Sequence, residues 1–332
     1  MPAEPGGATA RTVVPLLDAD AASVRKLRRR SLANLARMGH CAPTVMQTLL
    51  DASELEAEWL VKATAGLPGG IGNTGDECGG VTAPLMLLGL RHAHDPLDRG
   101  VPVVVYKGHD LLQRFSTCHG TALCREIRGN DRLPLRCVGV VRQAPETYCQ
   151  TSTHDCRSAI PDSYHEAFAR LDAHFVEHDF HCAHAVFTQL RPVMPVDQAL
   201  LDATSGFLAG TVFTGRTCSA FTAGVMALGI AFGAIEQSRL RVLRMIGLMA
   251  VGGDAFADDR NAFNKTMNLG HSLSQWFAAE FGSTQCRTIT QCDFSTTEGV
   301  EHYIGCGQLA RCADMARRVG AHVREIVAAY AS

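Results

Sequence analysis

"GHDLLQRFSTCHGTALCREI", residues 108–127, recurs in altered form as "GHSLSQWFAAEFGSTQCRTI", residues 270–289. Nine of the twenty positions are identical, among them a Gly-His pair, a phenylalanine and a Cys-Arg pair. Chance is a poor explanation for this agreement between segments 162 residues apart. A chain with internal repeats uses one structural unit more than once. The two segments therefore indicate that the fold is a duplication.

Two further pairs of segments extend the repeat toward the N-terminus. Residues 60–90 and 200–230 share thirteen of thirty-one positions at an offset of 140, and "HCAPTV" at 40–45 matches "HCAHAV" at 181–186 at an offset of 141. The offset grows to 162 because the second half carries extra residues near 239–259.

The spacing of apolar residues predicts helices in both halves. The predicted helical segments of the first half are Val24 to Leu35, Thr44 to Leu50, Leu55 to Ala65, Val81 to Leu90 and Leu111 to Ile127. Strand-like alternation is nearly absent apart from "VPVVVY" at Val101. We predict an all-α protein of two homologous helical bundles, residues 20–150 and 163–330, arranged as a pseudo-twofold tandem repeat. Each bundle is expected to have about five helices, with a linker near residues 150–162.

Composition excludes several classes of function. The net charge is -2 and the pI is about 6.7, so the chain has no general attraction for nucleic acid or anionic membranes. The basic run "RKLRRR" at residues 25–30 is interpreted as the solvated face of an amphipathic helix. No apolar run is long enough for a membrane span, and no secretory signal is visible. We therefore expect a cytoplasmic protein without membrane spans.

Thirteen cysteines are many for a cytoplasmic chain, where structural disulfides are rare. The repeat matches three pairs directly, and a fourth is assigned because each member opens an apolar-periodic stretch. The four pairs are Cys41 with Cys182, Cys78 with Cys218, Cys124 with Cys286, and Cys137 with Cys312. Cys149 and Cys306 are rivals for the last pair, and Cys292 could also replace a ligand. Apart from these alternatives, the cysteines without a counterpart are interpreted as structural, namely Cys118, Cys149, Cys156, Cys292 and Cys306.

The matched cysteines are predicted at similar structural points in each half. In the first half, Cys41 and Cys78 are expected to start helices, Cys124 to lie late in a helix, and Cys137 to begin the last one. A helix N-terminus lowers the pKa of a thiol, so three of the four positions should favour the thiolate that binds metals. The alternative without a functional role is that the cysteines are small core residues retained in both copies of the duplicated unit.

Other readings of these segments are less well supported. The chain contains no Cys-x-x-Cys, which argues against zinc ribbons and thioredoxin-like sites. The glycines of "GGIGNTG" follow no predicted strand, and their copy "AGTVFTG" keeps only two of them, which argues against nucleotide binding.

Two matched polar pairs accompany the cysteines. His109 with His271 could hydrogen-bond to sulfur or relay protons, and Arg125 with Arg287 could offset the charge of thiolates.

The order of these motifs resembles the redox-active protein family named for its C_GCAxxG_C_C cysteine pattern. The chain looks like two such units fused, covering about Leu32 to Tyr148 and Tyr164 to Ala329. The resemblance implies helical units with four characteristic cysteines each, which are the eight matched cysteines given above. Both copies depart from the central motif: "CGGVTA" has Gly80 and Ala83, and "CSAFTA" has Ser219 and Ala223.

We expect each half to gather its four cysteines around an iron–sulfur cluster, [4Fe-4S] or [2Fe-2S], in a protein for electron transfer or an oxidoreductase. A metal-free thiol–disulfide oxidoreductase is one alternative, and a zinc or copper(I) thiolate protein without catalysis is another. The expected partner is a redox protein or a small-molecule substrate, and the chain could form a homodimer. No nucleophile triad or phosphate-binding loop identifies a catalytic residue.

Overall fold

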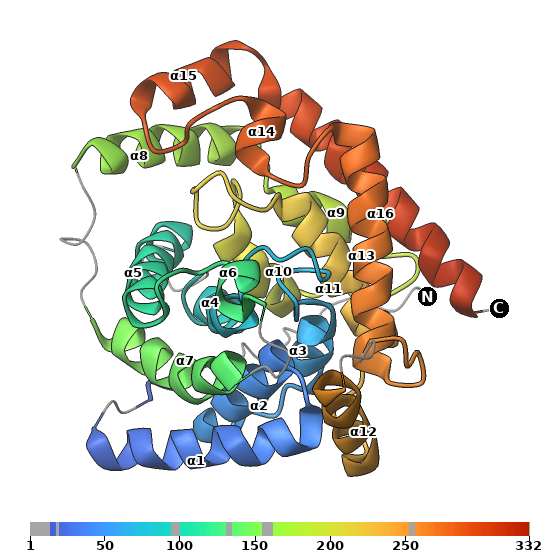
Figure 1. The fold of residues 1–332 in the computed structure, drawn as a ribbon. Coiled ribbons are helices and arrows are strands. Elements are labelled where there is room, and N and C mark those ends of the chain that lie inside the picture. Colours follow the sequence, from blue (N-terminus) through green and yellow to red (C-terminus); the bar gives the residue numbers. More distant parts are fainter. Residues whose placement is uncertain are drawn as a thin grey trace, which may run out of the picture.

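The computed structural model describes residues 14–17, 20–93, 100–130, 135–154, 162–251 and 256–331. Over these ranges the chain is built of helices and contains no β-strand beyond two isolated bridges (Figure 1). The helices of the first half are α1 (Ala21–Met38), α2 (Cys41–Ser53), α3 (Glu58–Ala63), η1 (Thr64–Gly66), α4 (Gly79–His92), α5 (Val101–His119), α6 (Cys124–Arg128) and α7 (Leu135–Thr153). Those of the second half are α8 (Asp162–Glu177), α9 (Cys182–Leu190), α10 (Gln198–Thr204), η3 (Ser205–Phe207), α11 (Ser219–Phe232), α12 (Arg239–Ala250), α13 (Ala262–Phe281), α14 (Cys286–Thr290), α15 (Thr297–Gly305) and α16 (Gln308–Ala331).

The two halves repeat one arrangement of helices, as the sequence predicts. Helices α2, α3, α4 and α6 correspond to α9, α10, α11 and α14 at the offsets of the sequence repeat, while α5 corresponds to α13 and α7 to α16. In each half the helix after the glycine-rich turn, α4 or α11, packs against the other main helices. Helices α12 and α15 have no counterpart among the described residues of the first half. The extra residues near 239–259 thus supply α12, which packs against α1.

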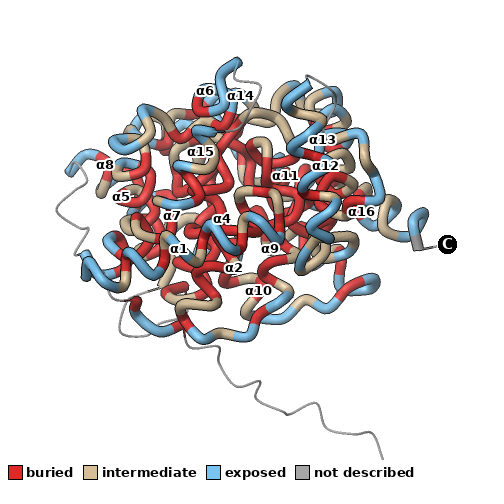
Figure 2. Tube along the Cα trace, turned by 60° about the horizontal axis from the view of Figure 1, so that its bottom comes forward, coloured by how far each residue is buried: buried red, intermediate tan, exposed pale blue. Residues whose placement is uncertain are grey.

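The halves are joined along a common core rather than connected as separate bundles. Helix α4 packs on α10, and α11 packs on α3, so each half lies against the other through equivalent elements. Gly89 and Gly229 mark these crossings. A Cβ atom at Gly89 would lie 2.4 Å from the carbonyl oxygen of Asp202, and one at Gly229 would lie 2.5 Å from that of Lys62. Buried residues of both halves form one continuous hydrophobic cluster, which fills the middle of the molecule in Figure 2.

Two local predictions are wrong. Leu111 to Ile127 is not one helix, because α5 ends at His119 and Gly120 takes a left-handed conformation with φ of 79°. Glycine favours this C-terminal position because it lacks a Cβ atom. The strand-like "VPVVVY" at Val101 is the first part of α5. Most of the predicted linker lies outside the described residues, and its first residues belong to α7.

None of the described helices combines the length and apolar character that a membrane span requires.

Candidate functional site

The matched cysteines of each half come from four separate segments and meet at one place. In the first half, Cys41 begins α2, Cys78 is the N-cap of α4, Cys124 begins α6, and Cys137 lies in the first turn of α7. The second half repeats this with Cys182 at the start of α9, Cys218 as the N-cap of α11, Cys286 at the start of α14, and Cys312 near the start of α16. Cys124 and Cys286 therefore start short helices, which corrects the expectation that they lie late in a helix. We call these sets the first and second cysteine groups.

The segments that carry two cysteines of each group are joined by the same backbone hydrogen bonds. In the first half, the amide of Cys78 donates to the carbonyl of Ala122 at 2.8 Å, and that of Cys124 donates to Asp76 at 2.7 Å. The second half repeats both bonds, from Cys218 to Thr284 at 2.8 Å and from Cys286 to Arg216 at 2.7 Å. Main-chain bonds of this kind hold the backbones of the two cysteines in the same relative position in both halves.

A left-handed turn precedes the second cysteine of each group. Residues 69–73 all have positive φ, and so do residues 209–213. Left-handed conformations normally occur as single residues, usually glycine. The second turn has only Gly210 and includes the β-branched Thr211 and Val212, so it carries local strain that its burial must overcome. Each turn aims a backbone amide at a sulfur, Gly69 at Cys41 and Ala209 at Cys182.

Burial, not the helix N-terminus, controls the ionisation of these thiols. Desolvation and the repulsion of neighbouring thiolates raise the pKa of Cys124 to about 11 and that of Cys78 well above its usual value. The pKa of Cys218 is raised to about 12, by burial first and then by Cys312. The backbone amides at the helix starts lower these values by less than burial raises them. The expectation that the positions favour free thiolates is therefore wrong, because the helix-terminus effect is outweighed once the sulfur loses contact with water.

The second group encloses a small cavity. Its volume is about 10 Å³, and its lining includes all four cysteines together with Ser219, Ile289 and Met315. The Cys218 sulfur lies 3.7 Å from the sulfur of Met315. Burial raises the pKa of Cys312, and the nearby Tyr303 hydroxyl and Arg311 partly offset the rise. Tyr303 and Met315 were not singled out from the sequence, because neither stands in a matched motif.

The first group is the more accessible of the two. Cys41 and Cys137 are only partly buried, whereas all four cysteines of the second group are buried. A Cβ atom on Gly79 would lie 2.7 Å from the Cys41 sulfur. The absence of a side chain at this position therefore leaves the room that the sulfur of Cys41 occupies.

The rival cysteines are placed apart from these groups or at their edge. Cys149 is buried farther along α7, and Cys306 is exposed, with its sulfur 3.4 Å from Nδ1 of His302. Cys292 is buried near Cys286, but its thiol donates to the carbonyl of Thr290 at 3.2 Å. Cys118 is exposed. Cys156 lies outside the described residues.

The matched histidines do not contact the sulfurs of their own halves. Nε2 of His109 contacts the Tyr164 hydroxyl and lies 2.7 Å from the carbonyl oxygen of Val212, so it reaches into the other half. His271 is exposed and lies 3.4 Å from the amide nitrogen of Gln275.

The matched arginines pair with carboxylates. Arg125 lies 3.2 Å from Asp76, and Arg287 lies 3.0 Å from Asp293. The cation that acts on Cys124 and Cys137 is instead Arg128, which lowers the pKa of both against the effect of burial. The sequence contained a signal for this role, because Arg128 follows Cys124 by four residues, which is about one turn of a helix.

The sulfurs of each group are more widely spaced than ligands of a single ion. Across the described residues, the group of three ligand atoms found within 4.8 Å of one another is His174, Glu177 and His178 on α8, and no three cysteine sulfurs meet this limit. Tetrahedral zinc with bonds of about 2.3 Å would bring its sulfurs to within about 4 Å of one another.

Comparison with known proteins is consistent with the duplicated cysteine pattern. The family described as "Putative redox-active protein (C_GCAxxG_C_C)" matches residues 39–165 and again residues 180–326. The search of curated proteins and that of solved structures returned no match. The two family matches together span most of the chain, and each contains one cysteine group. The chain belongs to the C_GCAxxG_C_C family of redox-active proteins and carries two copies of its unit in tandem.

Proposed function

We propose that each half binds an iron–sulfur cluster through its cysteine group, and that the protein acts in electron transfer or as an oxidoreductase. The ligands would be Cys41, Cys78, Cys124 and Cys137 in the first half, and Cys182, Cys218, Cys286 and Cys312 in the second. Such a cluster supplies one-electron chemistry when bound. The observation that carries the proposal is the convergence, twice, of four thiols from four separate segments in a largely dry interior.

The ionisation of the thiols supports a metal over a free nucleophile. A thiol attacks a disulfide as its thiolate, and burial holds these thiols in the protonated form at neutral pH. A bound cation removes this obstacle, since it is the largest local charge and deprotonates the thiols that bind it. The metal-free thiol–disulfide alternative is therefore the less favoured.

The residues present fit a cluster in donor type. Four cysteines are the usual ligand set of [2Fe-2S] and [4Fe-4S] clusters. The 10 Å³ cavity of the second group holds about one water, so the four side chains must turn outward to admit several ions.

The chain's own groups would tune such a centre. Amides at Gly69 and Ala42 donate to Cys41, and those of Ala220 and Phe221 donate to Cys218. Hydrogen bonds to ligand sulfurs and exclusion of water both shift the reduction potential. The more accessible first group is the better placed to meet a redox partner, and the buried second group should have the more strongly protein-controlled potential. A chain with so many free thiols suits the cytoplasm, which we keep as its proposed location.

Anaerobic purification tests the proposal. We expect a brown protein with iron and acid-labile sulfide, and we expect Cys78→Ala and Cys218→Ala each to lose about half of both. Cys149→Ala is the matched control, because this cysteine is also buried but belongs to neither group. A colourless protein without iron would reject the proposal. Stoichiometric zinc or copper without sulfide would favour the thiolate-metal alternative, and a change in thiol count on reduction without any metal would favour the thiol–disulfide alternative.

A further inference from the structure

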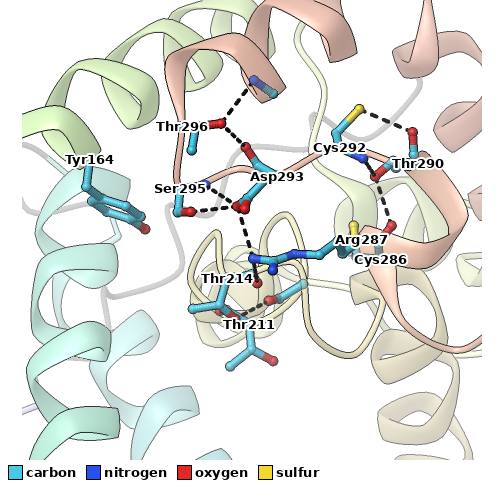
Figure 3. A network of polar contacts seen from close by, with 12 residues as sticks. Tyr164, Thr211, Thr214, Cys286, Arg287, Thr290, Cys292, Asp293, Ser295 and Thr296 are labelled. Carbon is cyan, nitrogen blue, oxygen red and sulfur yellow. Dashed lines mark hydrogen bonds and ion pairs between the residues drawn. The ribbon is translucent and has the colours of Figure 1, made fainter.

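A large open cavity lies between the two halves, beside the second cysteine group. Its volume is about 920 Å³, within the range of small-molecule sites. Helix α5 of the first half forms one wall, and the start of α8, the end of the left-handed turn and the start of α14 form the others. Gln285 and Arg287 line it, and they flank Cys286 of the second cysteine group. Figure 3 shows Tyr164 facing this turn from α8, with the Cys286 sulfur behind Arg287.

The duplication reveals a reversal of charge at this wall. In the first half, Asp76 lies 3.2 Å from Arg125 and accepts a hydrogen bond of 2.9 Å from Thr74. The residue equivalent to Asp76 is Arg216, at the offset of 140, and the residue equivalent to Arg125 is Arg287. One half therefore has an ion pair where the other has two guanidinium groups.

The two arginines of the cavity differ in how far their charge is satisfied. Arg287 is bound by Asp293 at 3.0 Å and by the carbonyl of Thr214 at 3.4 Å. Arg216 forms no ion pair with any residue that the structure describes, and its buried Nη1 has no hydrogen-bond acceptor. A buried donor of a charged group without an acceptor is costly, and few such groups persist without a bound partner.

Other titratable groups at the cavity do not neutralise Arg216. Asp110 faces the cavity, but its carboxylate lies 2.6 Å from Arg114 and 3.6 Å from His154. His109 remains neutral at physiological pH, because burial, with a smaller contribution from Arg216, lowers its pKa to about 4. The remaining polar side chains of the lining, which include Gln113, Thr214, Gln285, Thr288 and Ser295, are neutral donors and acceptors.

We propose that this cavity binds a small anion, a carboxylate or a phosphate, held by Arg216 and Arg287. A guanidinium matches the planar or tetrahedral oxygens of both groups with two parallel hydrogen bonds. The neutral side chains around it would take the hydroxyl or carbonyl groups of a larger metabolite. If the bound anion is the substrate of the second redox centre, that role rests on the proposed function. Anion binding itself does not depend on it.

Calorimetric titration of the purified chain, with and without iron, tests the site. The probes are inorganic phosphate and succinate, with sodium chloride at equal ionic strength as the blank. We expect saturable binding of at least one probe by both forms of the protein, weakening as salt rises. A phosphate-only result identifies a phosphorylated ligand, and a succinate-only result identifies a carboxylate.

Variants locate the binding. Arg216→Gln and Arg287→Gln should each weaken it at least about tenfold, because each removes a charge-assisted contact. Arg216→Asp reproduces the arrangement of the first half and should abolish binding. Arg125→Gln, the matched change in the first half, should leave the affinity unchanged. The proposal would be overturned if the wild type bound neither probe, or if both Gln variants kept the affinity of the wild type. A purified protein that contains no iron but still binds the anion would contradict only the proposed function.

Discussion

Replacing Gly89 with alanine should weaken the contact between the two halves and destabilise the molecule. Gly89 lies inside α4, where the backbone would accept alanine, and α10 of the other half crosses directly above it. The added methyl would lie 2.4 Å from the carbonyl oxygen of Asp202 and 3.3 Å from the Cα of Ala203. Both contacts are with backbone, so no side chain can rotate to make room.

The expected change in free energy is the difference of two terms. Alanine in place of glycine inside a helix gains about 1 kcal/mol, because the unfolded chain loses conformational freedom. Overpacking costs about 1–3 kcal/mol in an ordinary core, and a contact with backbone belongs at the upper end of that range. The net effect is a loss of about 1–2 kcal/mol in the free energy of unfolding. Gly229→Ala should behave alike, since its methyl would lie 2.5 Å from the carbonyl oxygen of Lys62.

Urea unfolding followed by circular dichroism measures both changes. Gly139→Ala is the matched control, because Gly139 is an exposed residue inside α7 with no atom within 4 Å of an added methyl. It should raise the free energy of unfolding by about 0.5–1 kcal/mol. If Gly89→Ala were to stabilise the protein as much as Gly139→Ala, the close crossing of α4 and α10 would be refuted.

Three further predictions follow from the cysteine groups and the contact between the halves. In the metal-free protein, folding raises the pKa of Cys124 from about 9 to about 11, so the folded state keeps this proton to a higher pH than the unfolded state. Raising the pH from about 9 to about 11 should therefore cost about 3 kcal/mol of the free energy of unfolding. The metal-loaded protein should instead gain stability as the pH rises toward 9, because its ligands are already deprotonated; equal slopes in urea titrations of the two forms would contradict this. Gly79→Ala should lower the iron content of the first half alone, because the added methyl would lie 2.7 Å from the Cys41 sulfur and force it to move. An unchanged iron content by elemental analysis would count against this prediction. Glu77→Ala should cost about 2 kcal/mol or more in urea unfolding, because the buried amide and hydroxyl of Thr217 would lose their acceptor, whereas Glu77→Gln, which keeps an acceptor, should cost less.

The fold could be predicted from the sequence where the signal was local or repeated. Helical periodicity placed most helices of the first half. The apolar-periodic stretches that open with Cys137 and Cys312 paired these two cysteines, and in the structure each lies near the other matched cysteines of its half. The break between α5 and α6 was missed although its signal was present, since Gly120 and Gly282 are matched glycines at a helix C-terminus.

The remaining features depend on packing between distant segments. The left-handed turn at 209–213 could not be predicted, because Thr211 and Val212 locally favour extended backbone and are held by burial. The pKa of Cys78 was predicted in the wrong direction, because the helix start is visible in the sequence and its depth in the core is not. The cavity at Arg216 exists only because α5 of one half lies beside the turn of the other.

Each left-handed turn contacts the long helix of the opposite half, Gly72 against Gly270 and Val212 against Gly108. The chain is thus equivalent to a symmetric dimer whose subunits have been joined end to end. In a dimer of identical subunits, every substitution is present at both symmetry-related places. Fusion removes that constraint, and Asp76 and Arg216 are a position where the two copies have diverged in charge. A joined pair can therefore specialise one site while conserving the other, a division of labour that no homodimer of this unit could encode.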